Sequence, residues 1–232
     1  MIKGDKTSYI QLRSGAARLF FGLAFAALAG WVDSVGFVSL GSFYLSFMSG
    51  NTTKIAVAAP AGQWQAFLKC GAIILSFFIG GFVGTLLADA SGRFRLSVLL
   101  ASEFALFGAA ISLMQATPTP LALLPVAAAM GMQNHLRQLV GPPDVGKTFV
   151  TGSLFSAGQS LARALTGNAP RAEWLAHLSI WLAFFLGAAG GAYALHRSSL
   201  LSNLYAIAAL LASLALFTAP ARSFAHDQDV EG

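Results

Sequence analysis

Apolar residues along this chain fall into eight blocks separated by short polar, Pro-containing or Gly-containing stretches. A helix that crosses a bilayer needs about 20 predominantly apolar residues, and six of the blocks meet this requirement easily. The pattern predicts an all-α polytopic membrane protein in which residues 1–232 form a single integral membrane domain with polar tails at 1–15 and 221–232. The blocks are 16–40, 43–60, 65–88, 96–115, 119–137, 146–165, 173–195 and 200–219.

Polar and glycine residues interrupt the second and sixth blocks at corresponding places. The second block carries a polar run from Ser49 to Lys54, and a similar run begins 102 positions later at Thr151. Hydrocarbon offers no water to such groups, so they indicate segments that line a protein-enclosed or wet cavity. We expect Gly50 and Gly152 to act as backbone hinges, because glycine leaves helical dihedral angles without a Cβ penalty. The residues of these segments expected to line a substrate or ion path are Ser49, Asn51, Thr52 and Thr151.

The distribution of basic residues bears on whether these two blocks cross the membrane. With a cytoplasmic N-terminus, eight full crossings leave nine of the 14 Lys and Arg residues on the cytoplasmic side, whereas six crossings with two re-entrant segments leave eleven of 14 there. Basic residues concentrate on the cytoplasmic side of membrane proteins. The bias therefore favours six full transmembrane helices plus two short broken or re-entrant segments, with eight transmembrane helices as the alternative.

The chain also contains two similar halves, approximately 16–116 and 119–219. The run from Phe77 to Gly84 corresponds, 107 positions later, to the run from Phe184 to Gly191. Six crossings give the halves opposite orientations, as in many secondary transporters, whereas eight crossings make them parallel. Each run carries Gly at i and i+4, a spacing that lets another helix approach closely, either within one subunit or across a subunit interface. These helix-packing glycines are Gly80, Gly84, Gly187 and Gly191.

Composition and charge argue against several other classes of protein. Hydrophobic residues make up 56% of the chain and charged residues 10%, and the net charge of +5 comes without a basic stripe or stacking motif, so no nucleic acid partner is expected. The single Cys70 excludes an intramolecular disulfide, and the His residues lack ligand spacing, so we expect no metal and no cofactor. The chain has no nucleophile elbow, Walker loop or dinucleotide fingerprint, so we do not expect an enzyme.

Two carboxyl groups and two amides lie inside apolar blocks. A carboxylate at mid-depth costs at least ~2.5 kcal/mol, so Asp33 and Glu103 should face protein or water and are candidate cation or proton sites. The alternatives are a solvated Asp33 at the membrane interface and a structural hydrogen bond for Glu103. Gln133 and Asn134 can donate and accept hydrogen bonds, which suits them either to a polar path or to bonds between helices.

Two signatures surround these positions. The first runs from Gly30 to Phe37 (GWVDSVGF) and continues at 47–52 (FMSGNT), and the second joins Met130 to Asn134 (MGMQN) with 147–154 (KTFVTGSL). Together they resemble the signatures of the YoaK-like family, bacterial membrane proteins with a domain of unknown function. The resemblance implies a multi-pass protein of the bacterial inner (plasma) membrane and carries no biochemical activity with it. Lys54 and Lys147 depart from the family pattern and add positive charge beside the signatures.

Two classes of function remain. We expect a secondary transporter or channel for a small solute, with proton or cation coupling as an option and a central site built from the two repeated polar segments. The alternative is a non-transporting membrane scaffold or accessory subunit, in which the same polar residues close networks between helices. The expected partners are the lipid bilayer and a small solute or ion, and the glycine grooves leave a homodimer open.

Overall fold

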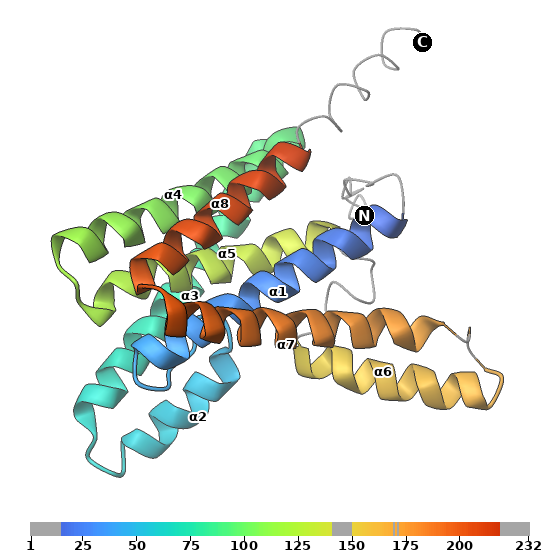
Figure 1. The fold of residues 1–232 in the computed structure, drawn as a ribbon, viewed down its shortest axis with the longest axis horizontal. Helices are drawn as coiled ribbons and strands as arrows, with labels where there is room; N and C mark the ends of the chain where they lie inside the picture. The colour runs from blue at the N-terminus through green and yellow to red at the C-terminus, as the bar shows by residue number, and fades with distance from the viewer. Residues whose placement is uncertain (1–14, 141–149, 169, 171, 219–232) are drawn as a thin grey trace, which may run out of the picture.

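The computed structural model describes residues 15–218 except 141–149, 169 and 171, and this part of the chain consists of helices joined by turns and loops, with no strand (Figure 1). Two short 3-10 turns, η1 (Gly92–Phe94) and η2 (Pro120–Leu123), flank the fourth α-helix. The α-helices are α1 (Gly15–Ser39), α2 (Met48–Ala58), α3 (Trp64–Ser91), α4 (Arg95–Ala116), α5 (Leu124–Val140), α6 (Val150–Leu165), α7 (Glu173–Arg197) and α8 (Leu200–Thr218).

Four helices are long and apolar enough to cross a membrane. They are α1 over Leu19–Ser39, α3, α4 and α7. A shorter apolar stretch, Leu200–Leu216, lies in α8, and α5 has 17 residues. The all-α membrane fold predicted from the hydrophobic blocks is confirmed at this level, while the number of full crossings stays a prediction.

The second and sixth blocks form the two shortest α-helices of the described chain. With 11 residues, α2 is about 17 Å long, and α6, with 16 residues, is about 24 Å long. Both are shorter than the hydrocarbon core of about 30 Å. The chain reverses between α1 and α2 at two consecutive positive-φ residues, Gly41 (φ 80°) and Ser42 (φ 70°), and only the glycine adopts this conformation at no steric cost.

The direction of the helices follows from which residues pack together. Early α1 (Phe21 and Phe25) shares a buried cluster with Met132 late in α5, whereas later α1 (Val32 and Val35) packs with the first turns of α5, so these two helices are antiparallel. By the same reasoning α4 and α8 are antiparallel, with Gln115 Nε2 late in α4 donating to the Tyr205 hydroxyl early in α8 at 2.9 Å.

Two further pairs of helices, α1 with α7 and α3 with α5, run parallel to each other. In the first pair, Gly22 lies beside Ile180 and Gly30 beside Phe184. In the second pair, the Ser76 hydroxyl donates to the Leu124 carbonyl at 2.7 Å, and Gly84 lies beside Met132. Since α1 and α5 are antiparallel, α3 and α7 are antiparallel as well. The helices α1, α3 and α4 therefore each run opposite to the helix four places later in the chain (Figure 1).

Glycines set the closest approaches in both parallel pairs. A Cβ on Gly30 in α1 would collide with the backbone of Phe184 and Ala188 in α7, and a Cβ on Gly131 in α5 would collide with the backbone of Phe77 and Gly81 in α3. The collisions are also reciprocal, because Cβ atoms on Gly187 and Gly80 would strike the backbone of Ala27 and Ala128, respectively. The residues of the two contacts correspond in sequence. Those of α1 and α5 are 101 positions apart, and those of α3 and α7 are 107 positions apart. Helix packing without a hydrophobic drive depends on such backbone contact.

The four glycines predicted from the i, i+4 spacing therefore lie between helices of one chain. Gly80 and Gly84 face α5, and Gly187 and Gly191 face α1. The grooves that left a homodimer open are filled within the subunit, so a dimer would have to use another surface.

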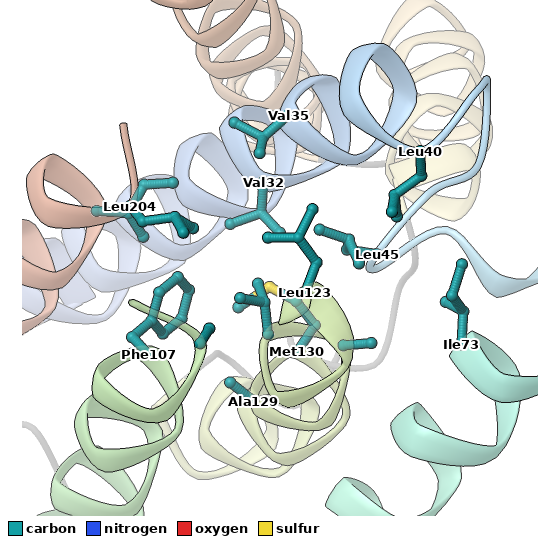
Figure 2. Close-up of a cluster of buried hydrophobic side chains, with 14 of the residues drawn as sticks. Val32, Val35, Leu40, Leu45, Ile73, Phe107, Leu123, Ala129, Met130 and Leu204 are labelled. Atoms are coloured by element: carbon teal, nitrogen blue, oxygen red, sulfur yellow. The ribbon is translucent and has the colours of Figure 1, made fainter. Parts of the chain in front are cut away.

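A buried apolar cluster holds the centre of the bundle together. Figure 2 shows side chains from α1 (Val32 and Val35), α4 (Phe107) and α8 (Leu204) meeting Met130 of α5. Leu45, from the loop before α2, is fully buried in the same cluster. The loop that leads into α2 is thus anchored in the core rather than lying on the surface.

Candidate functional site

Asp33 is the centre of a hydrogen-bonded loop at residues 40–47. Its side chain is 3% exposed, and its Oδ1 accepts backbone N–H bonds from Leu45 (2.9 Å), Ser46 (2.6 Å) and Phe47 (3.3 Å). Its Oδ2 accepts the Ser46 hydroxyl at 2.8 Å. A carboxylate that accepts several N–H bonds has the partners that burial demands. Asp33 therefore holds the loop that leads into α2, and it is not solvated at the membrane interface.

Asn51 fastens α2 to the same loop from the other side. Its Oδ1 accepts the Tyr44 N–H at 3.0 Å and its Nδ2 donates to the Tyr44 carbonyl at 2.7 Å, which imitates a backbone pairing. The Asn51 carbonyl accepts the Cys70 thiol of α3 at 3.0 Å, and the Asn51 side chain is fully buried. Both ends of the Asn51 amide are thus committed to structure.

Three aromatic rings surround the ammonium group of Lys54. Its Nζ lies 5.4 Å from the centroid of Phe37, 5.2 Å from that of Phe43 and 5.3 Å from that of Tyr44. Cation–π attraction of this kind is worth about 0.5–2 kcal/mol, depending on desolvation. The Lys54 ammonium thus contacts two rings of the loop that Asp33 and Asn51 hold and one ring of α1.

The remaining predicted residues of the first segment lie elsewhere. Ser49 and Thr52 are exposed, and the Thr52 hydroxyl donates to the Met48 carbonyl of its own helix at 2.9 Å. Gly50 lies in the first turn of α2 with helical backbone, and a Cβ there would collide with the Phe47 ring. The non-helical break that we expected at Gly50 lies before it, in the loop.

The second segment places a different residue inside. Thr151 is exposed, and Gly152 is helical within the first turn of α6. The buried residue is Ser153, with 0% exposure and no hydrogen-bond partner for its hydroxyl among the described residues. Ser153 stands 102 positions after Asn51, so the sequence correspondence could have found it. Lys147 lies outside the described residues.

The narrow face that α6 turns inward is polar. Ser153, Ala157 and Ser160 are its buried residues, while Leu154 and Leu165 are exposed. The stripe packs against α7, where His177 is 6% exposed and its Nδ1 has no partner within the described chain. The exposed residues of α6 are mixed, since Leu154 and Phe155 stand beside Gln159 and Arg163, so the feature that sets α6 apart is its pair of buried serines.

Glu103 and Gln133 are buried and carry polar atoms that have no hydrogen-bond partner among the described residues. Glu103 in α4 is 0% exposed and neither of its carboxyl oxygens accepts or donates a hydrogen bond within the described residues. Gln133 in α5 is 2% exposed, and its Nε2 is equally unpaired. Asn134 is half-buried. Among the described residues, no group of three or more His, Cys, Asp or Glu side chains could hold a metal ion.

Comparisons with known proteins place this arrangement in a family. The profile of a family described as "Protein of unknown function (DUF1275)" matches residues 21–217. The chain belongs to this family. A UPF0700 transmembrane protein of Rhizobium meliloti (strain 1021) is 35% identical over 215 residues, covering 92% of each chain. No solved structure matches.

Membership of DUF1275 agrees with the resemblance that the two signatures carry. The YoaK-like name is consistent with it, and the transmembrane relative supports a multi-pass protein in a lipid bilayer. The family description assigns no activity, so function has to be argued from the residues of this chain.

Proposed function

We propose that this DUF1275 protein is a secondary transporter or channel for a small solute, built from two intertwined halves of opposite orientation. The observation that carries the proposal is the matched pair of helix crossings: α1 meets α7 as α5 meets α3, through corresponding glycines. Inverted repeats of this kind underlie alternating access in many secondary transporters. The proposal places the protein in the bacterial inner membrane with its N-terminus in the cytoplasm.

The two short helices supply the ends of the path. Each carries polar signature residues in its first turn, and each is too short to cross the bilayer on its own. The N-terminal turn of a helix offers free N–H groups and a positive dipole, which suits it to polar solute groups. In this proposal Ser153 and Gln133 line the path, whereas Asp33 and Asn51 position the loop beside it.

A flux measurement on proteoliposomes tests the proposal. Purified protein reconstituted with phosphatidylethanolamine and phosphatidylglycerol should raise the uptake of at least one member of a panel of sugars, polyols, amino acids and inorganic ions above that of empty vesicles. Ser153→Ala should change that flux without lowering the melting temperature. The control is Ser213→Ala, since that hydroxyl only bonds the Ala209 carbonyl of its own helix at 2.8 Å. Equal uptake by protein-containing and empty vesicles across the panel would refute transport.

One observation favours a scaffold or accessory subunit as the second candidate. The polar atoms of Asp33 and Asn51, from the first signature, are committed to the 40–47 loop. A scaffold predicts no flux in any vesicle, together with co-purification of a membrane partner that is lost when the loop is released by Asp33→Ala.

A further inference from the structure

An unpaired carboxyl group in the interior of this bundle needs a physical explanation. Glu103 is fully buried, and both of its oxygens lack a partner within the described chain. An ionised carboxylate without a partner costs several kcal/mol in such surroundings, which is a large share of the stability of a typical domain. The group must therefore be neutral or gain a partner in another state of the protein.

The surroundings of Glu103 along α4 are apolar. Leu99 and Leu100 lie one turn before it and Phe107 one turn after it, and all three are buried. Leu99 and Leu100 belong to the same cluster as Met132, while Phe107 belongs to the cluster of Met130. Glu103 thus lies between two apolar clusters, at the level of residues 130–133 of α5.

Gln133 lies at the same depth by an independent count. Glu103 stands 13 residues before Ala116 (116 minus 103), about 20 Å from the end of α4. Gln133 stands nine residues into α5 (133 minus 124), which together with the four residues of η2 is about 22 Å from the same connection. By these counts, Glu103 and Gln133 lie at similar distances from the connection between α4 and α5.

The charged groups on the packed helices lie away from this level or are already engaged. Asp89 of α3, Arg95 of α4 and His135 of α5 lie near one another, and the eight residues from Arg95 to Glu103 correspond to about 12 Å. Among the described side chains, the remaining titratable groups of α1, α3 and α8 are Asp33, in its loop, Cys70, bonded to Asn51, Lys69, on the N-terminal part of α3, and Tyr205, bonded to Gln115. No described basic side chain pairs with Glu103.

We propose that Glu103 is a proton-binding site in the membrane interior, and that Gln133 connects it to the end of the bundle marked by Asp89, Arg95 and His135. The inference deepens the proposed transport function and rests on it for its biological use. A metal cation needs several oxygen ligands, and this level offers the carboxyl of Glu103 and one amide oxygen, whereas a proton needs a single lone pair. On release, the Glu103 O–H bond breaks, its electron pair stays on the carboxylate, the proton passes to water at the His135 end, and Gln133 Nε2–H donates to the new charge.

Infrared difference spectroscopy on the full chain in phospholipid nanodiscs tests the site without any transport. Wild-type protein should show the C=O stretching band of a buried protonated carboxyl, and this band should shift in heavy water and disappear at alkaline pH. The control variant Glu173→Gln, which removes an exposed carboxyl at the start of α7, should show the same band. Glu103→Gln should lose the band and keep the melting temperature, because glutamine imitates the neutral acid.

Three outcomes would overturn the proposal. The band could persist in Glu103→Gln, it could be missing from wild type from mildly acidic to neutral pH, or Glu103→Gln could fail to fold, which would mean that the charged form is required. Gln133→Leu should slow the loss of the band after a pH jump by tenfold or more, and an unchanged rate would remove Gln133 from the route. A band without flux in proteoliposomes would refute the proposed transport function and leave the proton site standing. Flux that is unchanged in Glu103→Gln would support transport that does not use this proton.

Discussion

The loop before α2 should detach when the Asp33 carboxylate is removed. Asp33→Ala leaves three backbone N–H groups and the Ser46 hydroxyl without their acceptor. Two of the backbone bonds are no longer than 2.9 Å, and an unsatisfied buried donor costs about 1–3 kcal/mol, so the two together give a loss of about 4 kcal/mol. At about 2–4 °C per kcal/mol for a chain of this size, the melting temperature should fall by roughly 10 °C.

Cys70 provides the assay. It is the single cysteine of the chain, it is fully buried, and its thiol bonds the Asn51 carbonyl of α2. A thiol-reactive dye in detergent micelles therefore reports the release of α2 as well as global unfolding.

Two milder variants calibrate the result. Asp33→Asn keeps an acceptor and can donate to the Ser46 hydroxyl, so it should cost about 1 kcal/mol, and Ser46→Ala, which loses one bond, should cost a similar amount. A melting temperature for Asp33→Ala within about 2 °C of wild type would refute the loop-holding role. If that stable variant also lost flux, Asp33 would belong to the solute path instead.

Two further predictions concern packing and topology. Gly187→Ala should lower the free energy of unfolding by about 2–3 kcal/mol, because its Cβ would strike the α1 backbone. Gly190→Ala, with open space around it, should be neutral or slightly stabilising. Equal effects of the two substitutions would refute close packing of α1 on α7. A cysteine introduced at exposed Ala61 in a Cys70→Ala background should react with an impermeant maleimide from the periplasmic side of intact cells. Labelling only from the cytoplasmic side would refute the six-crossing arrangement with a cytoplasmic N-terminus.

Hydrophobic patterning predicted the helices well because period and length are local properties of the chain. The eight blocks correspond to the eight described α-helices, and the two interrupted blocks are the two shortest ones. The i, i+4 spacing also identified Gly80 and Gly187 as packing residues, since only a missing Cβ permits backbone contact.

The roles of the polar residues could not be predicted in the same way. Asp33 and Glu103 look alike in sequence, as single acids in apolar blocks, yet one accepts four hydrogen bonds from a loop and the other accepts none among the described residues. The sequence likewise shows that Asn51 and Ser153 stand at corresponding positions. It does not show that the Asn51 amide has hydrogen-bond partners whereas the Ser153 hydroxyl has none among the described residues.

By itself, the sequence determined that this chain is a membrane protein, that it is built from α-helices, and that polar and glycine motifs recur along it. These properties depend on transfer free energies and helical periodicity, which act residue by residue. The tertiary structure alone decided which helix each glycine meets, that α1 pairs with α7 and α3 with α5, and which acid has no partner among the described residues. Those outcomes depend on long-range contacts, in which partners up to 172 residues apart, such as Trp31 and Asn203, share one hydrogen bond.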